Sequence, residues 1–190
     1  MILPQSFYRN EDVVETARLL LGKILFTKIN GTETAGIITE TEAYNGAADR
    51  ACHAYNFRRT ARTEVMYAEG GVAYVYLCYG IHSMFNVVTG AEGNPQAILI
   101  RGIKPSVNLK KMENRLGRKI TAGLHGPGLV SKALGIHYRH SGISLLIPEK
   151  IWIEDRGISF SRKQIKITPR IGVDYAGKDA LLPYRFVAEI

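Results

Sequence analysis

The sequence predicts a single domain of mixed α/β (α+β) class that spans residues 1–190. The length and the 46% apolar content suffice for one sizeable core and do not require a second domain. Short runs rich in β-branched and aromatic residues alternate with segments of helical spacing, which indicates both strands and helices. Strand-like runs flank the dipeptides Asn30-Gly31 and Tyr79-Gly80, so a hairpin is expected at each.

Three short helices are expected. Asn10 precedes "EDVVETARLLLG", a run with acids in its first turn, an apolar stripe and Gly22 at the place of a C-terminal stop. Residues 106–119 have helical spacing, with basic side chains on the polar side. After "HGPG", residues 129–136 form a third helical run that Gly135 stops.

The strand-like runs are short and separated by turn residues. They cover residues 23–29, 35–44, 72–88 (as a hairpin), 97–105, 150–155, 164–173 and 184–190. The run "AILIRGIKP" is expected to be a buried strand that ends before Pro105. Residues 45–64 lose their periodicity and become polar, which predicts a long loop with one short helix.

Two glutamates interrupt the strand "GIITETEAY", residues 36–44. Because side chains alternate faces along a strand, Glu40, Glu42 and Tyr44 share one side. From this segment alone, the simpler interpretation is a strand with one solvated face. The alternative is a pair of acids with a function, placed beside an aromatic ring.

The charge balance suggests a polyanionic partner, with nucleic acid as the leading candidate. Lysine and arginine number 25 against 17 acids, which gives a formal charge of +8 and a pI near 9.5. Basic residues gather at Arg58, Arg59 and Arg62, at 104–119 and at 162–170. A basic protein that binds no polyanion is the alternative that composition leaves open.

Composition also bears on location. No segment approaches the roughly 20 apolar residues that a membrane span requires, and the N-terminus lacks a basic region followed by a long apolar run. Cys52 and Cys78 are too few for a disulfide framework, which fits a reducing compartment. We therefore expect a cytoplasmic monomer without a membrane partner, associated with the nucleoid if it is bacterial.

Several enzyme classes lack their motifs in this chain. The histidines show no H-E-x-x-H pattern and no cysteine cluster at zinc spacing, so no metal site is expected. "HGPGLVSK" lacks G-x-x-x-x-G-K-[ST], which disfavours nucleotide hydrolysis. No G-x-S-x-G elbow is present, and neither cysteine has the partners of a nucleophile.

The aromatic hairpin at 72–88 has two possible roles. Tyr74, Tyr76 and Cys78 share one face, and Tyr79 falls next to the turn, where a core side chain is hard to cover. An exposed ring at a hairpin tip could act as a wedge in a stacked duplex, and aromatic faces could hold an extruded base. The alternative is a tyrosine-rich hairpin that packs on its own sheet.

The order of motifs resembles a known family. "ETEAY" is followed by a histidine nine residues after its tyrosine, then by "YVYLCYG", "FNVV", "ILIRGIKP", "HGPGLVSKALGI" and "PRIGVDYAG…PYRF". Together these motifs resemble the alkyladenine (3-methyladenine) DNA glycosylases, from about residue 5 to the C-terminus. The resemblance implies a curved antiparallel sheet with surrounding helices and a protruding hairpin, and neither a metal nor a redox cofactor.

The resemblance implies three groups around a catalytic water. Glu42, the second acid of "ETEAY", matches the carboxylate that activates the water. Arg101 matches the arginine that helps to hold it, and the backbone carbonyl of Ile171 matches its third ligand. Glu40 is left with a structural or supporting role.

The resemblance also implies a pocket for the base. Tyr44, His53 and Tyr76 match the walls that stack the extruded base, and Asn86 matches a residue that helps to exclude normal guanine. Tyr79 matches the hairpin residue that fills the vacated place in the minor groove. The expected substrate is double-stranded DNA that contains damaged purines.

The implied reaction needs little machinery. Alkylation at a ring nitrogen puts positive charge on the base, so the base leaves as a neutral molecule and a protonating acid becomes optional. One carboxylate must orient and deprotonate water against C1′, as in half of a glycoside hydrolase pair.

The loop "AYNFRRTART", with Arg58 and Arg62, departs from the family's usual glycine-rich form, and His82 and Phe85 differ from common hairpin residues. These departures leave the lesion range open.

Two other functions stay open at this point. The first is a non-catalytic nucleic-acid-binding module that uses the same hairpin and basic surface. The second is a nuclease or phosphoryl-transfer enzyme, which would need a divalent metal. The acids form no obvious metal pair, so the second is the weaker alternative.

Overall fold

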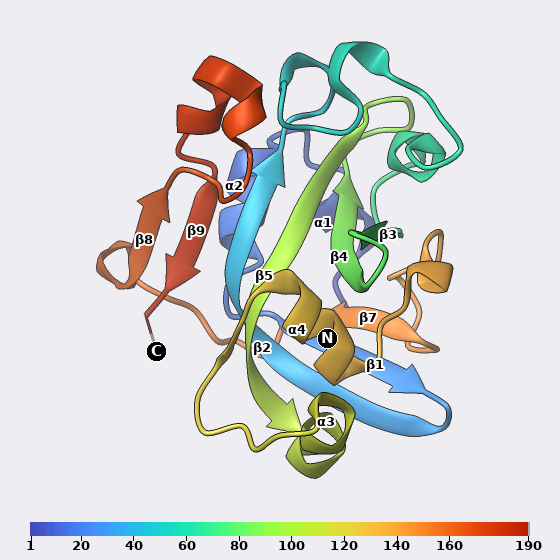
Figure 1. Ribbon diagram of the computed structural model, residues 1–190, viewed down its shortest axis with the longest axis vertical. Helices are drawn as coiled ribbons and strands as arrows, with labels where there is room; N and C mark the ends of the chain where they lie inside the picture. Colours follow the sequence, from blue (N-terminus) through green and yellow to red (C-terminus); the bar gives the residue numbers. More distant parts are fainter. Residues whose placement is uncertain (190) are drawn as a thin grey trace.

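Two long antiparallel strands, β2 (Thr32–Tyr44) and β5 (Gln96–Val107), run side by side through the middle of the computed structural model (Figure 1). The structure describes residues 1–189. The remaining strands are β1 (Ile24–Ile29), β3 (Ala73–Cys78), β4 (His82–Thr89), β6 (Leu124–His125), β7 (Ile151–Glu154), β8 (Ile165–Thr168) and β9 (Arg185–Ala188). They join β2 and β5 in one curled antiparallel sheet, so the predicted mixed α/β class and sheet are confirmed.

Strand β2 is the branch point of the sheet. One edge pairs with β5 along most of its length, and the other edge pairs first with β1 and then, at Glu40–Glu42, with β9. The hairpin of β3 and β4 extends the sheet beyond β5, in the order β3-β4-β5-β2-β1-β7. Because β9 comes from the end of the chain, the segment that carries Glu40 and Glu42 lies between elements far apart in the sequence.

Helices cover both faces of the sheet. They are α1 (Gln5–Tyr8), α2 (Val13–Leu19), α3 (Leu109–Leu116) and α4 (Pro127–Leu134). In Figure 1, α4 crosses in front of the sheet and α2 lies behind it. The Thr41 hydroxyl donates a hydrogen bond to the Ala17 carbonyl of α2 over 2.8 Å, so the odd-numbered side of this part of β2 faces α2. The even-numbered side, with Glu42, faces away from α2.

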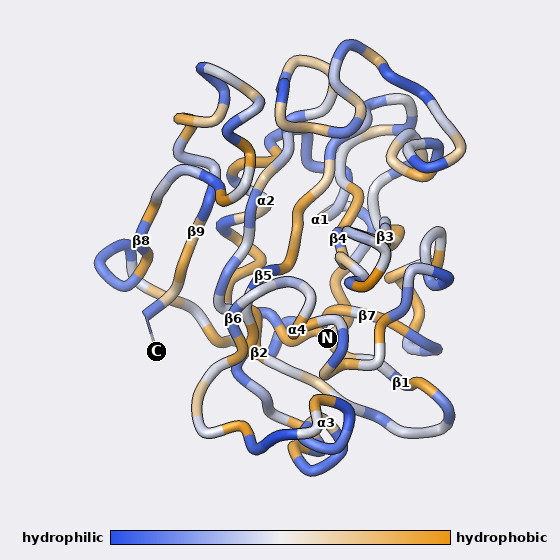
Figure 2. The backbone as a smooth tube through the Cα atoms, viewed as in Figure 1, coloured by the Kyte–Doolittle hydropathy of each residue, from blue (hydrophilic) through white to orange (hydrophobic). Residues whose placement is uncertain are grey.

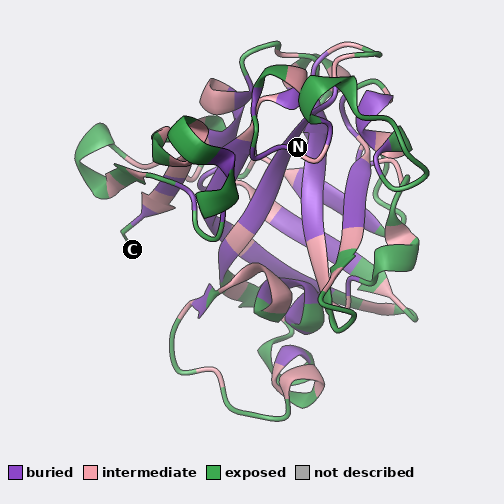
Figure 3. Ribbon diagram, turned by 45° about the horizontal axis from the view of Figure 1, so that its top comes forward, coloured by how far each residue is buried: buried purple, intermediate pink, exposed green. Residues whose placement is uncertain are grey.

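The core lies between these layers. Its fully buried side chains come from α2 and the residue after it, from β5 and from α4, among them Ala17, Leu20, Ile98, Ile100, Ile103, Val130 and Leu134. Figure 2 shows β5 as strongly apolar along its central part, and Figure 3 shows the central strands largely buried while the outer loops are exposed. Within residues 1–189, no helix is long and apolar enough to cross a bilayer.

The predicted helices exist with shifted ends. Asp12, and not Asn10, caps α2, since its side chain accepts a hydrogen bond from the Glu15 amide; Asn10 instead accepts one from the Asp12 amide. Because the helix begins after this cap, Glu11, the first acid of the predicted run, lies outside it. Helix α4 begins earlier than predicted, with Pro127 at its first position, and stops at Gly135 as expected.

Two predicted strand ends are wrong. Strand β5 continues through Pro105 to Val107, because Pro105 lies opposite Gly36 at a shift of register, where a missing N–H is tolerated. The expected strand at 164–173 ends at Thr168, and the following residues turn toward the sheet. The last residue of the expected strand at 184–190 lies outside the described residues.

Both predicted hairpins are confirmed. Asn30 and Gly31 have φ angles of 52° and 71°, as a tight two-residue turn requires. Tyr79 and Gly80 have φ angles of 51° and 74° in a three-residue loop, since Cys78 pairs with His82. The expected loop at 45–64 contains the short 3-10 helices Gly46–Ala48 and Tyr55–Phe57. It lies at the top of Figure 1 beside the 3-10 segment Asp174–Leu181.

Irregular pairing marks the middle of the two long strands. The register of β2 against β5 shifts on both sides of Glu40, which lies opposite Gly102. The shifts leave Thr39 on β2 and Arg101 on β5 without an opposite residue, and such bulges commonly redirect a side chain. Gly102 makes the close approach possible, because a Cβ at that position would lie 2.8 Å from the Cβ of Glu40.

Gly102→Ala is therefore expected to lower the free energy of unfolding by about 1–3 kcal/mol, as overpacking does. The new methyl group would meet the Glu40 Cβ and the Thr39 hydroxyl, which lies 3.0 Å away, and the Glu40 Cβ cannot move without moving the strand. Urea unfolding followed by circular dichroism measures this change.

Gly123→Ala is the matched control. Its Cβ would lie 3.4 Å from the nearest atom, the His125 ring nitrogen, and its φ lies outside the positive range that disfavours alanine. A control change within about 0.5 kcal/mol is expected for such a site. Equal effects of the two substitutions would contradict the close contact at Gly102.

Candidate active site

A cavity of about 210 Å³ opens where the ends of β2 and β5 meet the aromatic hairpin. Its lining comes from β2, β5, the hairpin, the 45–64 loop, the start of α4 and the segment after β8. The lining residues that the following paragraphs use are Tyr44, His53, Tyr74, Tyr76, Tyr79, Asn86, Arg101, Ile171 and Tyr175. The cavity is smaller than the roughly 300–1,000 Å³ of sites for drug-sized ligands, which suits a single flat ring system.

Glu42 lies directly behind the wall of this cavity, and none of its side chain is exposed. Its Oε1 accepts a hydrogen bond from the Ile171 backbone amide over 2.8 Å, and its Oε2 accepts one from the Tyr44 hydroxyl over 2.9 Å. Arg101 Nε lies 3.3 Å from Oε1. The three groups that contact the carboxylate are themselves lining residues, so only this one layer of groups separates Glu42 from the cavity.

Glu40 is also buried, so the interpretation of a solvated acidic face is wrong. Its Oε1 accepts hydrogen bonds from Arg101 Nε at 2.9 Å and from Arg185 Nε at 2.8 Å. Arg101 thus lies between the two acids and contacts both. The bulge described above leaves Arg101 free of an opposite residue at this place.

The two carboxyl groups have opposite pKa shifts. Burial raises the pKa of Glu42 above its ordinary value, and the lowering effects of Arg101, the Ile171 amide and Tyr44 do not offset it. Burial also raises the pKa of Glu40, but hydrogen bonds from Arg185 and Arg101 outweigh it and bring the pKa below its ordinary value. Neighbouring carboxyls with divergent pKa values are typical of acid–base sites, where the raised member exchanges protons.

Aromatic rings form one side of the cavity. The rings of His53 and Tyr76 meet edge to face at 4.7 Å and 78°, and those of Tyr74 and Tyr76 lie 5.4 Å apart. Tyr44 approaches from β2 and also packs against this cluster. The structure therefore brings together Tyr44, His53 and Tyr76, the three residues expected to form the walls.

His53 is a neutral member of this wall. Burial, together with the nearby Arg62 and Arg58, lowers its pKa to about 4. Its Nδ1 lies 2.9 Å from the Tyr74 hydroxyl, and Arg62 Nη2 lies 3.2 Å from its Nε2. Since an arginine can only donate, Nε2 accepts and the ring proton belongs on Nδ1.

The hairpin carries two of the expected site residues, and it buries Asn86 while it exposes Tyr79. Asn86 is buried in the cavity wall, and its amide nitrogen donates to the carbonyls of Tyr74 and Met84, both over 3.1 Å. The Tyr79 side chain is 91% exposed at the turn, so it packs on no core. The alternative of a hairpin that packs entirely on its own sheet therefore fails for Tyr79, while it holds for the buried Tyr74.

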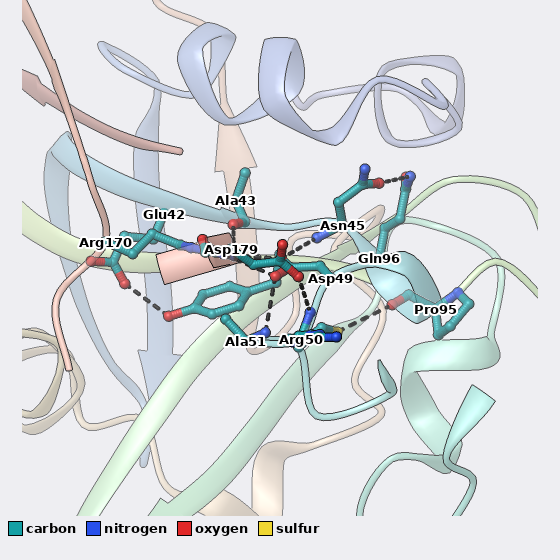
Figure 4. Close-up of polar contacts among 12 residues, drawn as sticks. Glu42, Ala43, Asn45, Asp49, Arg50, Ala51, Pro95, Gln96, Arg170 and Asp179 are labelled. Atoms are coloured by element: carbon teal, nitrogen blue, oxygen red, sulfur yellow. Dashed lines mark hydrogen bonds and ion pairs between the residues drawn. The ribbon is translucent and has the colours of Figure 1, made fainter. Parts of the chain in front are cut away.

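Several neighbours of the cavity were missed by sequence analysis. Arg170 was counted in a basic surface cluster, yet it is only 5% exposed and forms an ion pair with the buried Asp49 (Figure 4). Arg62 lies 4.6 Å over the Tyr76 ring, and Tyr175 lines the cavity mouth. The position of Arg170, directly before Ile171 in "PRIGV", was the one signal that could have drawn attention to it.

The structure also bears on metal binding. Among residues 1–189, no group of three or more His, Cys, Asp or Glu side chains is placed to hold a metal ion. The two acids nearest the cavity are occupied by arginines, as described above. Cys52 lies in the wall with its thiol pKa raised to about 12 by burial, which makes it a poor nucleophile.

Comparison with known proteins gives a consistent result. The family model described as "Methylpurine-DNA glycosylase" matches residues 6–189. A protein of Chlamydia felis is 46% identical, over 100% of this chain and 97% of its own length. Proteins of Bdellovibrio bacteriovorus and Bacillus cereus are 43% and 40% identical, over 98% and 100% of this chain and 94% and 96% of their own lengths. All three carry the name "Putative 3-methyladenine DNA glycosylase".

The low pKa of His53 predicts a dependence of stability on pH. An unfolded histidine titrates near 6.5, whereas His53 titrates at about 4 in the folded protein. Between these values the unfolded chain binds a proton that the folded protein does not, so the free energy of unfolding falls as the pH drops. The full effect is about 3 kcal/mol, which urea unfolding at pH 7 and pH 4.5 measures in large part.

His53→Gln removes this linkage. The difference in free energy of unfolding between wild type and the variant is expected to shrink as the pH falls from 7 to 4.5. His82→Gln, at an exposed histidine of the hairpin, serves as the control and should follow wild type in parallel. A difference between wild type and His53→Gln that does not vary with pH would contradict the buried neutral ring.

Proposed function

Because the chain belongs to the methylpurine-DNA glycosylase family and is thus a DNA glycosylase for alkylated bases, we propose how its residues perform the reaction. The proposed substrate is duplex DNA with an alkylated or deaminated purine. The enzyme extrudes the damaged nucleotide into the cavity and hydrolyses its N-glycosidic bond with a water activated by Glu42. The products are a free base and an abasic site in an intact strand.

One observation carries this proposal: a fully buried carboxylate with a raised pKa borders a small aromatic cavity. An acid with no function would be costly at this position, because burial of a charge needs compensation from several donors. Ile171 and Tyr44 each donate one hydrogen bond to Glu42. A carboxylate can accept about four, so an oxygen lone pair remains for a water at the wall.

In the proposed step, the water oxygen forms a bond to C1′ while the bond from C1′ to the base nitrogen breaks. The bonding electron pair leaves with the base, so a cationic alkylated base leaves as a neutral molecule and a deaminated base leaves as an anion that takes a proton from solvent. One water proton passes to Glu42, and the other stays on the new hydroxyl group at C1′. The negative carboxylate also stabilises the positive charge that develops on the sugar ring. Arg101, 3.3 Å from the carboxylate, and the backbone carbonyl of Ile171 are the proposed further ligands of the water.

The aromatic wall supports a role in selecting the base. We assign the stacking of the extruded purine to Tyr44, His53 and Tyr76 and the exclusion of guanine to Asn86. A cationic base over a tyrosine face gains about 0.5–2 kcal/mol from cation–π attraction. Because His53 is neutral, it adds no charge that would repel such a base.

The proposed DNA contacts lie outside the cavity. Tyr79, exposed at the hairpin tip and at the rim of the cavity, is the proposed wedge that takes the place of the extruded nucleotide. The formal charge of +8 supports attraction to the phosphate backbone. A duplex with a damaged base also opens more readily, which favours extrusion of the lesion.

Glu42→Gln tests the reaction. The variant keeps the shape of the side chain but removes the carboxylate that acts as the general base, so single-turnover release of hypoxanthine from duplex DNA should fall by about 10²–10⁴-fold. Cationic bases leave more readily and should be affected less. Binding to lesion DNA, measured by fluorescence anisotropy, should persist or tighten because one negative charge is lost.

Two further variants complete this test. Glu154→Gln, on β7 with hydrogen bonds from Trp152 and Arg156, is the matched control and should excise at the wild-type rate. If Glu40→Gln abolished excision while Glu42→Gln did not, the assignment of Glu42 as the general base would be wrong. If wild type bound lesion DNA without releasing any base, a binding module would replace the enzyme as the explanation.

Tyr79→Ser tests the wedge. Because the side chain is almost fully exposed, the substitution should change the melting temperature little. Extrusion of the base, followed with a fluorescent base analogue beside the lesion, should decrease together with the excision rate. A large loss of stability with unaltered excision would instead show that Tyr79 serves the fold.

A further inference from the structure

We infer that Arg170 is a positioning residue, whose buried guanidinium holds in place the two hydrogen-bond donors of the Glu42 carboxylate. The inference rests on the proposed function, because Arg170 influences the reaction only if Glu42 is the general base. Arg170 touches neither the cavity nor the carboxylate through its side chain; it acts through Tyr44 and Ile171.

The guanidinium of Arg170 makes contacts with three segments of the chain. It forms a bidentate ion pair with both carboxylate oxygens of Asp49. Asp49 directly follows the 3-10 helix Gly46–Ala48. It also donates to the Ala43 carbonyl of β2 over 2.8 Å and to the Asp179 carbonyl over 3.0 Å. These contacts fasten the segment after β8 to the end of β2 that carries Glu42.

Asp49 is fixed in its turn. Its Oδ2 accepts a hydrogen bond from the Asn45 amide and its Oδ1 one from the Ala51 amide, each over 3.0 Å (Figure 4). The carboxylate is 3% exposed and fully engaged, so Arg170 meets a partner that cannot rotate away. The planar fork of arginine matches this carboxylate in a way that a lysine cannot.

The first of the two donors is the Tyr44 hydroxyl. The Arg170 guanidinium lies 4.9 Å from the centre of the Tyr44 ring and 5.2 Å from that of Tyr184. Arg170 thereby packs on the Tyr44 ring and limits its tilt. The tilt decides whether the hydroxyl reaches Glu42 Oε2 at 2.9 Å.

The second donor is the backbone amide of Ile171, the residue that follows Arg170. Its hydrogen bond to Glu42 Oε1 is 2.8 Å long. The Ile171 side chain is half exposed at the cavity and gives the backbone little anchorage of its own. The buried side chain of Arg170 therefore determines where this amide lies.

Arg170→Lys is the first test. Lysine keeps the charge but loses the fork and the flat face, so both donors should shift from Glu42. Single-turnover excision of hypoxanthine should fall by about 10²-fold, a loss that a displacement near 1 Å can produce. The hydrogen bond from Tyr44 lowers the pKa of Glu42, so its loss should raise that pKa. As the pH is lowered, the excision rate of the variant should therefore begin to fall at a higher pH than the rate of wild type.

A double-mutant cycle with Tyr44→Phe separates positioning from a merely structural role. If Arg170 acts partly through the Tyr44 hydroxyl, the losses of rate in Arg170→Lys and Tyr44→Phe should not add when the two are combined. Additive losses, together with an unshifted pH profile, would overturn the inference.

Arg115→Lys is the matched control. Arg115 is also partly buried and donates to the Ala133 carbonyl and to the Thr34 hydroxyl, far from the cavity. This variant should keep the wild-type pH profile. Should Arg170→Lys fold poorly because of its unsatisfied Asp49, the neutral pair Asp49→Asn/Arg170→Gln removes both charges and should show the same shift in pH profile.

Glu42→Gln in the same assay separates this inference from the proposed function. Excision by Glu42→Gln at the wild-type rate would remove the general base and with it both claims. An inactive Glu42→Gln combined with a wild-type rate and pH profile in the Arg170 variants would overturn the inference alone.

Discussion

A carboxylate shielded from bulk solvent is stable in its charged form only if donors surround it, and the architecture of this protein follows from that constraint at Glu42. Its two hydrogen-bond donors come from β2 itself and from the segment after β8, and its ion-pair partner Arg101 comes from β5. The surroundings compensate the charge only in part, so the pKa remains raised. Incomplete compensation leaves the group able to take up a proton, whereas Glu40, two residues away, is held ionised by two arginines.

The contrast between the two acids shows how one strand produces two kinds of carboxyl group. Both side chains leave β2 on the same side, so alternation alone makes them equivalent. The difference arises from the neighbouring strands: β9 brings Arg185 to Glu40, and the bulge in β5 brings Arg101 between the acids. A rigid, buried strand then keeps each group at its own set of partners, which a flexible loop could not do.

Local patterns predicted what depends on local physics. The turns at Asn30-Gly31 and Tyr79-Gly80, the stop at Gly135 and the exposed ring of Tyr79 all follow from the residues themselves. The extension of β5 through Pro105 was not predictable, because it depends on a register shift against Gly36 in another strand. The burial of Arg170 was missed for the same reason, since its partner Asp49 lies 121 residues away. The family motif pointed to Glu42, but only the fold showed what surrounds it.

The distance along the chain between Glu42 and its partners has a consequence for how the protein is made. Ile171 is 129 residues from Glu42, and Arg185 is 145 residues from Glu40. Such long-range closures are slow compared with the formation of helices and tight turns. During synthesis, Glu42 and Glu40 therefore lack their Ile171 and Arg185 partners until the segment 165–188 has been made. The segment 165–188, made long after β2, thus completes the contacts of both acids at the centre of the sheet.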